Sequence, residues 1–214
     1  MAKVELVVFD IAGTTVKDNG NVADCFINAF RQHDRMVEVP EVNALMGFRK
    51  RDAIEILLDK SGIGIGRTKE ELVASIHDAF TREMISFYEN DAGLHPMPYA
   101  TELFMLLQQR GIKRALNTGF TKAITDTILH RLQWSVPGMV DAVISSDEVA
   151  NGRPHPDMIR NLMLALKVSD AQRVVKVGDT AVDVQEGRNA GCGLVVSVTS
   201  GTYSREQLEK CYPD

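Results

Sequence analysis

The feature that most constrains the fold is a buried-strand pattern that ends at an acidic residue near the N-terminus. Residues 4–9 read Val-Glu-Leu-Val-Val-Phe, and Asp10 follows directly. An apolar run of this kind is typical of a strand buried on both faces of a parallel sheet. Gly13 then allows the chain to turn. Because open α/β sheets bind ligands at the carboxyl ends of their strands, Asp10 is a candidate site residue. The structural alternative is an Asp that only caps the following turn.

A second strand of this kind ends at an acidic residue late in the chain. The β-branched run 173–177 leads to Asp179, and Asp183 follows one turn into the next predicted helix. Residues four apart lie on one face of a helix. We therefore expect Asp10, Asp179 and Asp183 to converge at one edge of the sheet, where oxygen ligands of this kind suit Mg²⁺ and phosphate-bearing substrates. Asp179 alone would indicate a helix cap, but two such junctions favour a metal site.

Two shorter segments between these junctions suit the binding of phosphate. The predicted strand 113–117 is followed by Thr118 and Gly119, whose hydroxyl and backbone amide are suited to hold a phosphate oxygen. Arg153 lies in a loop stiffened by two prolines, and its planar fork binds phosphate while keeping its charge. Each pattern is common by itself. Their order along the chain, Asp, then Thr-Gly, then Arg, then Gly-Asp-Thr, is the specific signal.

The pattern of apolar residues predicts an α/β protein with a doubly wound parallel sheet. The predicted strands are 5–9, 113–117, 141–145, 173–177 and 194–198. The predicted helices that separate the later strands are 100–109, 121–132, 156–166 and 183–189. Strands that alternate with helices are typical of βαβ units around a parallel sheet.

The long segment between the first two strands has no strand signal. It contains predicted helices at 22–35, 49–60 and 69–90, and a glycine-rich stretch at 62–66 separates the last two. Such a segment is too long and too periodic for a loop. We therefore predict a helical domain at 17–91, inserted into an α/β core domain formed by 1–16 and 92–214. The hinges are expected near 16–21 and 91–98, which are rich in turn-forming residues.

One lysine of the inserted domain has a position typical of a reactive amine. On the predicted helix 49–60, Lys50 shares a face with Ala53, Ile54 and Leu57, and an arginine flanks it on each side. Desolvation and neighbouring cations both lower the pKa of a lysine, which favours an amine nucleophile. The alternative is a lysine whose stem lies on apolar surface while its amine reaches water in a basic cluster.

Composition excludes several classes of partner. The chain has 214 residues and a net charge of −5, and no basic cluster exceeds residues 49–51, so we expect no binding to nucleic acid. The three cysteines are odd in number and lack metal-ligand spacing, which predicts a reducing, cytoplasmic location. No signal peptide or membrane-spanning run is expected, so we predict no membrane partner. The oligomeric state stays open, a homodimer included.

The ordered motifs resemble the haloacid dehalogenase superfamily over almost the whole chain. The resemblance implies a Rossmann-like core with an inserted helical cap, and a hydrolase that uses Mg²⁺. By this likeness Asp10 is a nucleophile that becomes an aspartyl-phosphate. The other implied site residues are Ala12, Asp179 and Asp183 at the metal together with Asp10, Thr118 and Gly119 at the phosphoryl group, and Arg153 as the cation of the third motif.

Two departures from the superfamily's usual pattern narrow this implication. Ala12 stands where most phosphatases carry an acid that protonates the leaving alcohol, a role worth about 10²- to 10⁴-fold in rate. Arg153 stands where the superfamily usually has Lys. Both features, with the Asp-Ile-Ala-Gly-Thr-Thr-Val segment and Met-Gly-Phe-Arg-Lys at 46–50, resemble the phosphonatase family. There a cap lysine forms a Schiff base with the substrate aldehyde, and the iminium accepts the electrons of the breaking carbon–phosphorus bond.

This second resemblance assigns Lys50 as the Schiff-base lysine, with Met46 and Phe120 at the substrate. The chain departs from the phosphonatase pattern at Ala53, where that family has a histidine, at Asn21, near the family's cysteine, and at Phe120 in place of tyrosine. The substrate therefore stays open between phosphonoacetaldehyde or a close oxo-phosphonate and a small phosphate ester such as phosphoglycolate. A non-catalytic protein that binds a phospholigand is disfavoured, because the nucleophile and both metal aspartates are present.

Overall fold

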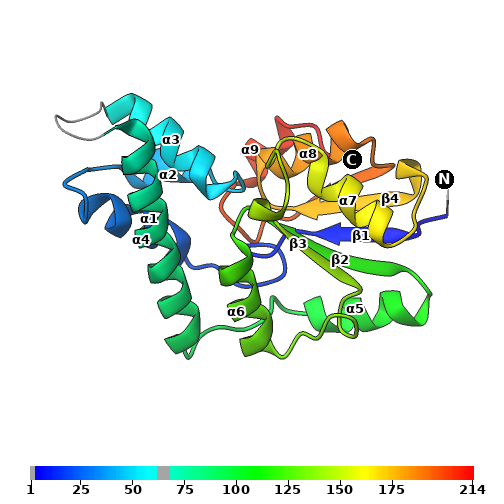
Figure 1. Cartoon of the computed structure of the whole chain (residues 1–214). Helices are drawn as coiled ribbons and strands as arrows, with labels where there is room; N and C mark the ends of the chain where they lie inside the picture. The colour runs from blue at the N-terminus through cyan, green and yellow to red at the C-terminus, as the bar shows by residue number, and fades with distance from the viewer. Residues whose placement is uncertain (1–2, 62–67) are drawn as a thin grey trace.

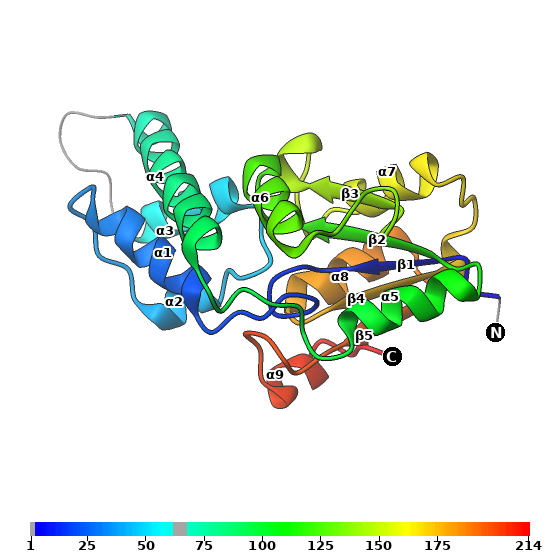
Figure 2. The same cartoon turned by 90° about the horizontal axis from the view of Figure 1, so that it is seen from below.

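The computed structural model describes residues 3–61 and 68–214. Figures 1 and 2 show one sheet flanked by helices, with a separate group of helices beside it. The sheet has five strands in the order β3-β2-β1-β4-β5, and every pairing is parallel. The strands are β1 (Leu6–Phe9), β2 (Lys113–Thr118), β3 (Ala142–Ser145), β4 (Val174–Gly178) and β5 (Leu194–Ser197). Because β1 is central, the residue that follows it lies at the middle of the sheet's carboxyl edge.

Helices cover both faces of the sheet, as the continuous apolar runs predict. In β1, Val7 and Phe9 belong to one apolar cluster, while Leu6 and Val8 belong to the other. Helices α5 (Ala100–Gln109) and α6 (Lys122–Leu132) pack on the first face; α7 (Asp157–Ala165) and α8 (Ala181–Ala190) pack on the second (Figure 1). The alternation of β1 side chains between the two clusters follows from the two-residue period of a strand. The predicted doubly wound α/β fold is confirmed.

Four helices between β1 and β2 form a group that lies beyond the carboxyl edge of the sheet (Figures 1 and 2). They are α1 (Asn21–Arg31), α2 (Val39–Asn43), α3 (Lys50–Ser61) and α4 (Lys69–Asn90), and we call them the helical group. Phe26 of α1 packs on Phe80 of α4 with ring centroids 4.5 Å apart. At the far end, Arg131 of α6 donates to the carbonyl of Tyr88 at 3.0 Å, which links α4 to the core.

The element bounds differ from the sequence prediction in a few places. Helix α1 ends at Arg31 rather than at residue 35, because Asp34 has a left-handed φ of 55° and the chain turns back so that the Arg35 amide bonds to the Phe30 carbonyl. The short helices α2 and α9 (Arg205–Glu209) were not predicted, since five residues show little periodicity. The glycine-rich stretch 62–66 lies outside the described residues. Within residues 3–61 and 68–214, no helix is long and apolar enough to span a membrane.

Candidate active site

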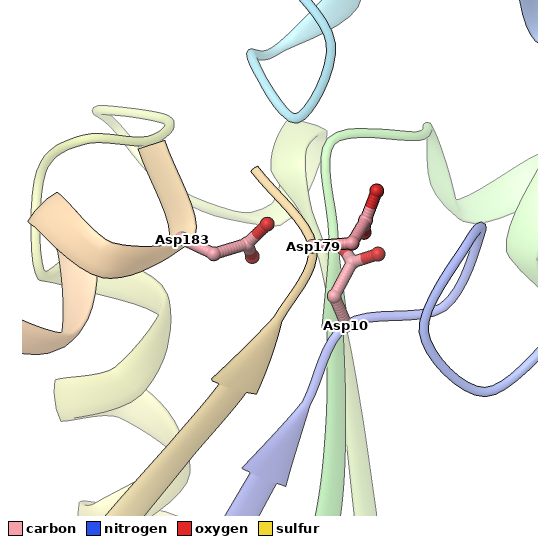
Figure 3. Close-up of side chains that lie close together, drawn as sticks. All are labelled: Asp10, Asp179 and Asp183. Atoms are coloured by element: carbon pink, nitrogen blue, oxygen red, sulfur yellow. The ribbon is translucent and has the colours of Figure 1, made fainter. Parts of the chain in front are cut away.

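Three carboxylates meet at the carboxyl edge of the sheet. Asp10 follows β1, Asp179 follows the neighbouring strand β4, and Asp183 lies in the first turn of α8. All three are buried, and one oxygen of each lies within 4.8 Å of the others. Figure 3 shows Asp10 and Asp179 side by side, with Asp183 extending toward them from α8. The three aspartates that were predicted from the two strand ends thus lie close together in the structure.

The chain around these carboxylates holds them in place. The Thr14 hydroxyl donates to Asp179 Oδ1 at 2.9 Å, and the Thr202 amide donates to Oδ2 at 3.0 Å. Gly13 is required beside this carboxylate, because its φ is +84° and a Cβ there would lie 2.8 Å from Asp179 Oδ2. Asp183 Oδ2 accepts from the Thr180 amide at 3.2 Å, which caps α8. Asp183 is therefore both a helix-capping residue and a member of the site.

The guanidinium of Arg153 bridges two of the three aspartates. Its Nη1 lies 2.7 Å from Asp10 Oδ1 and 3.1 Å from Asp183 Oδ1. Nη2 donates to the backbone and side-chain oxygens of Asn117, each at 2.8 Å, and Nε donates to Glu186 at 3.0 Å. All its nitrogens are therefore engaged within the protein. Arg153 therefore fixes the carboxylates of Asp10 and Asp183 relative to each other.

A second buried cation, Lys176 of β4, completes this cluster. Its Nζ lies 2.9 Å from Asp183 Oδ1, and it donates to Asn117 Oδ1 at 2.7 Å. Asn117 in turn donates to both oxygens of Glu186 at 2.8 and 2.9 Å. The members of this buried ionic network are Asp10, Asn117, Arg153, Lys176, Asp183 and Glu186. Each charged member is paired, as buried charges must be.

Sequence reasoning missed three of these residues: Lys176, Glu186 and Asn117. The signal for Lys176 was present, because a lysine between valines in a strand buried on both faces must have an ionic partner. Glu186 lies one turn after Asp183 on α8, so the two carboxylates share a helix face. Asn117 precedes Thr118 at the end of β2 and gave no signal by composition.

The electrostatics of the aspartates fit a divalent cation. Burial, together with the negative charges of Asp10 and Asp183, raises the pKa of Asp179 to about 8. Burial also raises the pKa of Asp10, although Arg153 opposes this. For Asp183 the effect of burial is outweighed by Arg153 and Lys176, which hold its pKa at about 2. The raised pKa values of Asp10 and Asp179 mean that their negative charges are not fully compensated by nearby positive charge. A hard cation that prefers oxygen ligands would supply this charge.

A cavity lies between these carboxylates and the helical group. From the core it is lined by Asp10, Ala12, Thr118, Gly119, Phe120 and Asp179, among others. From the segment that carries the helical group it is lined by Asp18, Val22, Met46, Gly47 and Lys50. Its volume available to the centres of water molecules is about 20 Å³, which is room for about one water. The helical group is therefore closed on the core in this structure.

Two glycines make this close approach feasible. Gly47 lies against α8, where a Cβ would lie 2.6 Å from Cγ2 of Val182, and its φ of +84° also disfavours other residues. Gly119, at the predicted phosphate position, lies against the carbonyl of Phe48, so a Cβ there would collide with backbone. Thr118 is buried beside it, and its hydroxyl accepts from the Phe120 amide at 3.1 Å. At these two glycines the backbone of one part of the molecule therefore lies directly against the other part.

Lys50 extends from α3 into the cavity. It is 4% exposed and shares its buried face with Ala53, Ile54 and Leu57, as the helical spacing predicted. Its Nζ lies 5.6 Å from the ring centroid of Phe26 and 5.2 Å from that of Phe120. Among the described residues it has no hydrogen-bond or ion-pair partner. Burial lowers the pKa of Lys50 to about 8; Asp10 opposes this effect and Arg153 adds to it.

One part of the expectation for Lys50 was wrong. The flanking arginines are not the cations that lower its pKa, because both are engaged elsewhere. Arg49 donates to the carbonyl of Ala150 at 2.9 Å, across the contact with the core. Arg51 pairs with Glu70 at 3.9 Å on the surface of the helical group. The nearby cation that acts on Lys50 is Arg153 of the core.

Comparison with known proteins identifies the family. The family described as haloacid dehalogenase-like hydrolase matches residues 4–191, which include strands β1 to β4, the three aspartates and both buried lysines of the site. The chain belongs to this family. The phosphonoacetaldehyde hydrolase of Bordetella pertussis is 32% identical over 220 residues, which cover 97% of this chain and 77% of that protein. The chain is therefore a hydrolase of the haloacid dehalogenase superfamily, with phosphonatase-like relatives.

Solved structures share the same fold. A phosphonoacetaldehyde hydrolase-like protein from Oleispira antarctica superposes with a TM-score of 0.79 at 24% identity, covering 97% of this chain and 78% of that one. A structure described as a predicted phosphoglycolate phosphatase from Haemophilus somnus gives a TM-score of 0.78 at 17% identity, covering 100% and 93%. These likenesses show the fold alone, so the choice of substrate rests on the residues of the site.

Proposed function

We propose that this protein is an Mg²⁺-dependent hydrolase that cleaves the carbon–phosphorus bond of phosphonoacetaldehyde or a close oxo-phosphonate. The observation that carries the proposal is the amine of Lys50, which is buried in the same cavity as Asp10 and has no ionic partner among the described residues. A lysine kept there only for its charge would retain a high pKa through a carboxylate partner. A lysine with a pKa of about 8 supplies a free amine near neutral pH.

Asp10 is proposed as the nucleophile. It lies at the end of the central strand and lines the cavity, and Arg153 orients one of its oxygens at 2.7 Å. Attack of Asp10 on phosphorus forms an aspartyl-phosphate, which water then hydrolyses. Thr118 and Gly119, at the end of β2, are placed to bind the phosphoryl oxygens. Arg153 holds the Asp10 carboxylate in position, and its positive charge helps to offset the repulsion between Asp10 and the phosphoryl group.

The oxygen donors of the site suit Mg²⁺. The proposed ligands are Asp10, Asp179, Asp183 and the backbone carbonyl of Ala12, which lines the same cavity. When bound, the ion would offset the repulsion between the substrate and Asp10 and polarise the phosphoryl oxygens. The methyl group of Ala12 offers no proton to a leaving group. The reaction proposed here needs none at this position, because its leaving group is an enamine.

Lys50 is proposed to prepare that leaving group. Its amine condenses with the aldehyde carbon and releases water, so that the substrate carries a protonated imine two bonds from phosphorus. The electrons of the breaking carbon–phosphorus bond then move onto this imine and give the enamine. Phe26 and Phe120 flank the amine, exclude water and keep it weakly basic. Met46 lines the substrate end of the cavity.

The second candidate is a phosphatase acting on a small phosphate ester such as phosphoglycolate, with Lys50 binding substrate charge. The Haemophilus somnus structure described as a predicted phosphoglycolate phosphatase shares this fold. Two features of the cavity disfavour this candidate. Ala12 supplies no acid for an alcohol leaving group, and Asp18 would repel a substrate carboxylate within a small, closed space. The aldehyde substrate meets neither difficulty.

The helical group is proposed to act as a cap. Residues 17–91 would form the cap domain, with 1–16 and 92–214 as the core, because Lys50 must leave the closed cavity for substrate to enter. Opening about the two linkers would admit a small phosphonate, and closure would exclude water from the imine. We propose no nucleic-acid or membrane partner, and a homodimer is compatible with the proposal.

The proposal is tested by separating the two chemistries. Purified protein would be incubated with phosphonoacetaldehyde and with a panel of phosphate esters, with and without Mg²⁺, and phosphate release measured. In parallel, borohydride reduction and peptide mass spectrometry would locate any adduct. We expect phosphate release from the aldehyde phosphonate, dependent on Mg²⁺, and an adduct on Lys50 that survives chelation of the metal. Asp10→Asn should lower turnover about 10³-fold or more while leaving the adduct.

Lys50→Arg is the decisive variant, because arginine keeps the charge but cannot form an imine. It should lose both the adduct and carbon–phosphorus cleavage. Lys60→Arg, on the exposed surface of the same helix, is the matched control and should behave as wild type. Absence of an adduct on Lys50, with rapid ester hydrolysis that survives in Lys50→Arg, would establish the phosphatase instead.

A further inference from the structure

Asp18 is a third carboxylate in the cavity that neither the metal site nor the phosphoryl site uses. It lies in the linker between β1 and α1 and is partly buried. Its Oδ1 accepts from the amides of Gly20 and Asn21 at 3.1 and 2.9 Å, so the side chain is fixed by the turn that starts α1. The amide of Val22 also stabilises this carboxylate. Three consecutive amides of the turn therefore fix the Asp18 side chain at the edge of the cavity.

The composition of the cavity makes Asp18 the remaining acid–base group. Of the described residues that line it, the carboxyl-bearing ones are Asp10, Asp179 and Asp18, and none is a histidine, cysteine, glutamate or tyrosine. Asp10 is paired with Arg153, and Asp179 is bonded by Thr14 and Thr202. Lys50 opens onto the same cavity as Asp18. Lys50 and Asp18 therefore line the same small cavity.

Resting on the proposed function, we infer that Asp18 transfers the protons that imine chemistry at Lys50 requires. It is a catalytic residue for the formation and breakdown of the imine, and it takes no part in attack on phosphorus. Asp18 is also connected to the surroundings of the Lys50 amine. The turn that fixes Asp18 starts helix α1, and Phe26 of α1 flanks the amine.

The carbonyl oxygen needs two protons to leave as water. After the Lys50 amine adds to the aldehyde carbon, Asp18 relays one proton from nitrogen to this oxygen and then gives its own carboxyl proton, which leaves the protonated imine and the Asp18 carboxylate. After Asp10 has taken the phosphoryl group, Asp18 regains a proton from bulk water and delivers it to the enamine carbon. Water then adds to the resulting iminium; Asp18 passes one proton of this water to nitrogen and takes the other as acetaldehyde departs, so the free amine and the Asp18 carboxyl form are restored. One further water hydrolyses the aspartyl-phosphate.

The environment of Asp18 suits this work. Burial raises the pKa of its carboxyl, and the turn amides and the charge of Lys50 only partly oppose this effect. A carboxyl whose pKa lies closer to the working pH is present in both its acid and its base form, so it can serve in both directions of proton transfer. The turn also fixes its position, so little conformational freedom is lost when it acts.

The test uses acetaldehyde, the product, so that phosphoryl chemistry is not involved. Wild-type protein in D₂O should exchange the methyl protons of acetaldehyde, because the iminium and the enamine interconvert on Lys50; proton NMR follows the exchange. Borohydride trapping gives the amount of adduct at equilibrium. Asp18→Asn keeps the oxygen that accepts from the turn amides but cannot carry a proton. It should leave the equilibrium adduct unchanged and slow the exchange about 10²- to 10⁴-fold.

The control is Asp24→Asn, which removes one negative charge from the exposed face of α1 and should exchange at the wild-type rate. Wild-type exchange rates in Asp18→Asn would overturn the role of Asp18 and leave the Lys50 chemistry standing. Loss of the adduct at equilibrium in Asp18→Asn would assign Asp18 a structural role and also overturn the inference. No adduct in wild type would overturn the proposed function itself.

Discussion

The two sides of the site differ in the surroundings of their buried, positively charged side chains. On the core side, Arg153 and Lys176 are fully buried and surrounded by carboxylates, with Lys176 lying 2.9 Å from Asp183. On the side of the helical group, Lys50 is equally buried but faces two aromatic rings and has no ionic partner among the described residues. Similar side chains are therefore placed in opposite electrostatic environments within one site.

This difference separates two tasks. A buried cation paired with carboxylates stays charged at any working pH, and it suits the binding of carboxylates and phosphate. A buried amine without a partner loses its proton readily and suits nucleophilic addition. The division also follows the chain, because the paired cations belong to the sheet and its loops, while the unpaired amine belongs to a helix of the inserted segment.

Removing a paired cation should give the largest change in stability. Lys176→Met leaves the buried carboxylates of Asp183 and Glu186 with less compensating charge, and we expect the free energy of unfolding to fall by about 3–5 kcal/mol. Urea denaturation followed by circular dichroism measures this change. Lys210→Met, at an exposed position, is the control and should stay within about 0.5 kcal/mol of wild type. A loss below about 1 kcal/mol for Lys176→Met would show that the network is not held by this charge.

The same substitution at Lys50 should act in the opposite direction. Burial lowers the pKa of Lys50 from 10.5 to about 8, so the folded state binds this proton less tightly than the unfolded state. Lys50→Met should therefore raise the free energy of unfolding by up to about 3 kcal/mol at pH 7. The penalty is complete below pH 8 and fades as the pH rises toward 10.5, so the gain should shrink by pH 10. A destabilised Lys50→Met at pH 7 would contradict the comparison.

The parts of the site that the sequence predicted are those set by periodicity. Asp10 and Asp179 each follow a short apolar run, and parallel strands place such residues at one edge. The burial of Lys50 follows from its spacing to Ala53 and Ile54 on one helix. These relations depend on local geometry alone, and they are present in a single sequence.

The rest depended on packing between distant segments. Phe26 flanks the Lys50 amine only because α1 and α3 both pack on α4, which no local pattern specifies. The long side chain of Arg153 reaches Asp183 and Glu186, partners that are distant in sequence. The error over the arginines beside Lys50 has a different origin, since neighbours in sequence on a helix point to different sides.

The smallest predicted effect concerns the pH at which Lys50 reacts. With a pKa of about 8, about 10% of the amine is free at pH 7, against about 0.03% for a lysine with a pKa of 10.5. The rate of imine formation with acetaldehyde, measured by borohydride trapping without metal, should rise about fivefold from pH 7 to pH 8 and level off above pH 9.

The charged groups that act on the amine are Asp10, Asp18 and Asp179, which raise its pKa, and Arg153, which lowers it. Added Mg²⁺ should move the midpoint to lower pH, because a positive ion near Asp10 weakens the attraction that retains the proton. The reference is Nα-acetyl-lysine, whose side-chain amine is free, and its rate should still rise at pH 10. A protein profile that follows N-acetyl-lysine would show that Lys50 is charged and solvated, and the two sides of the cavity would then be alike.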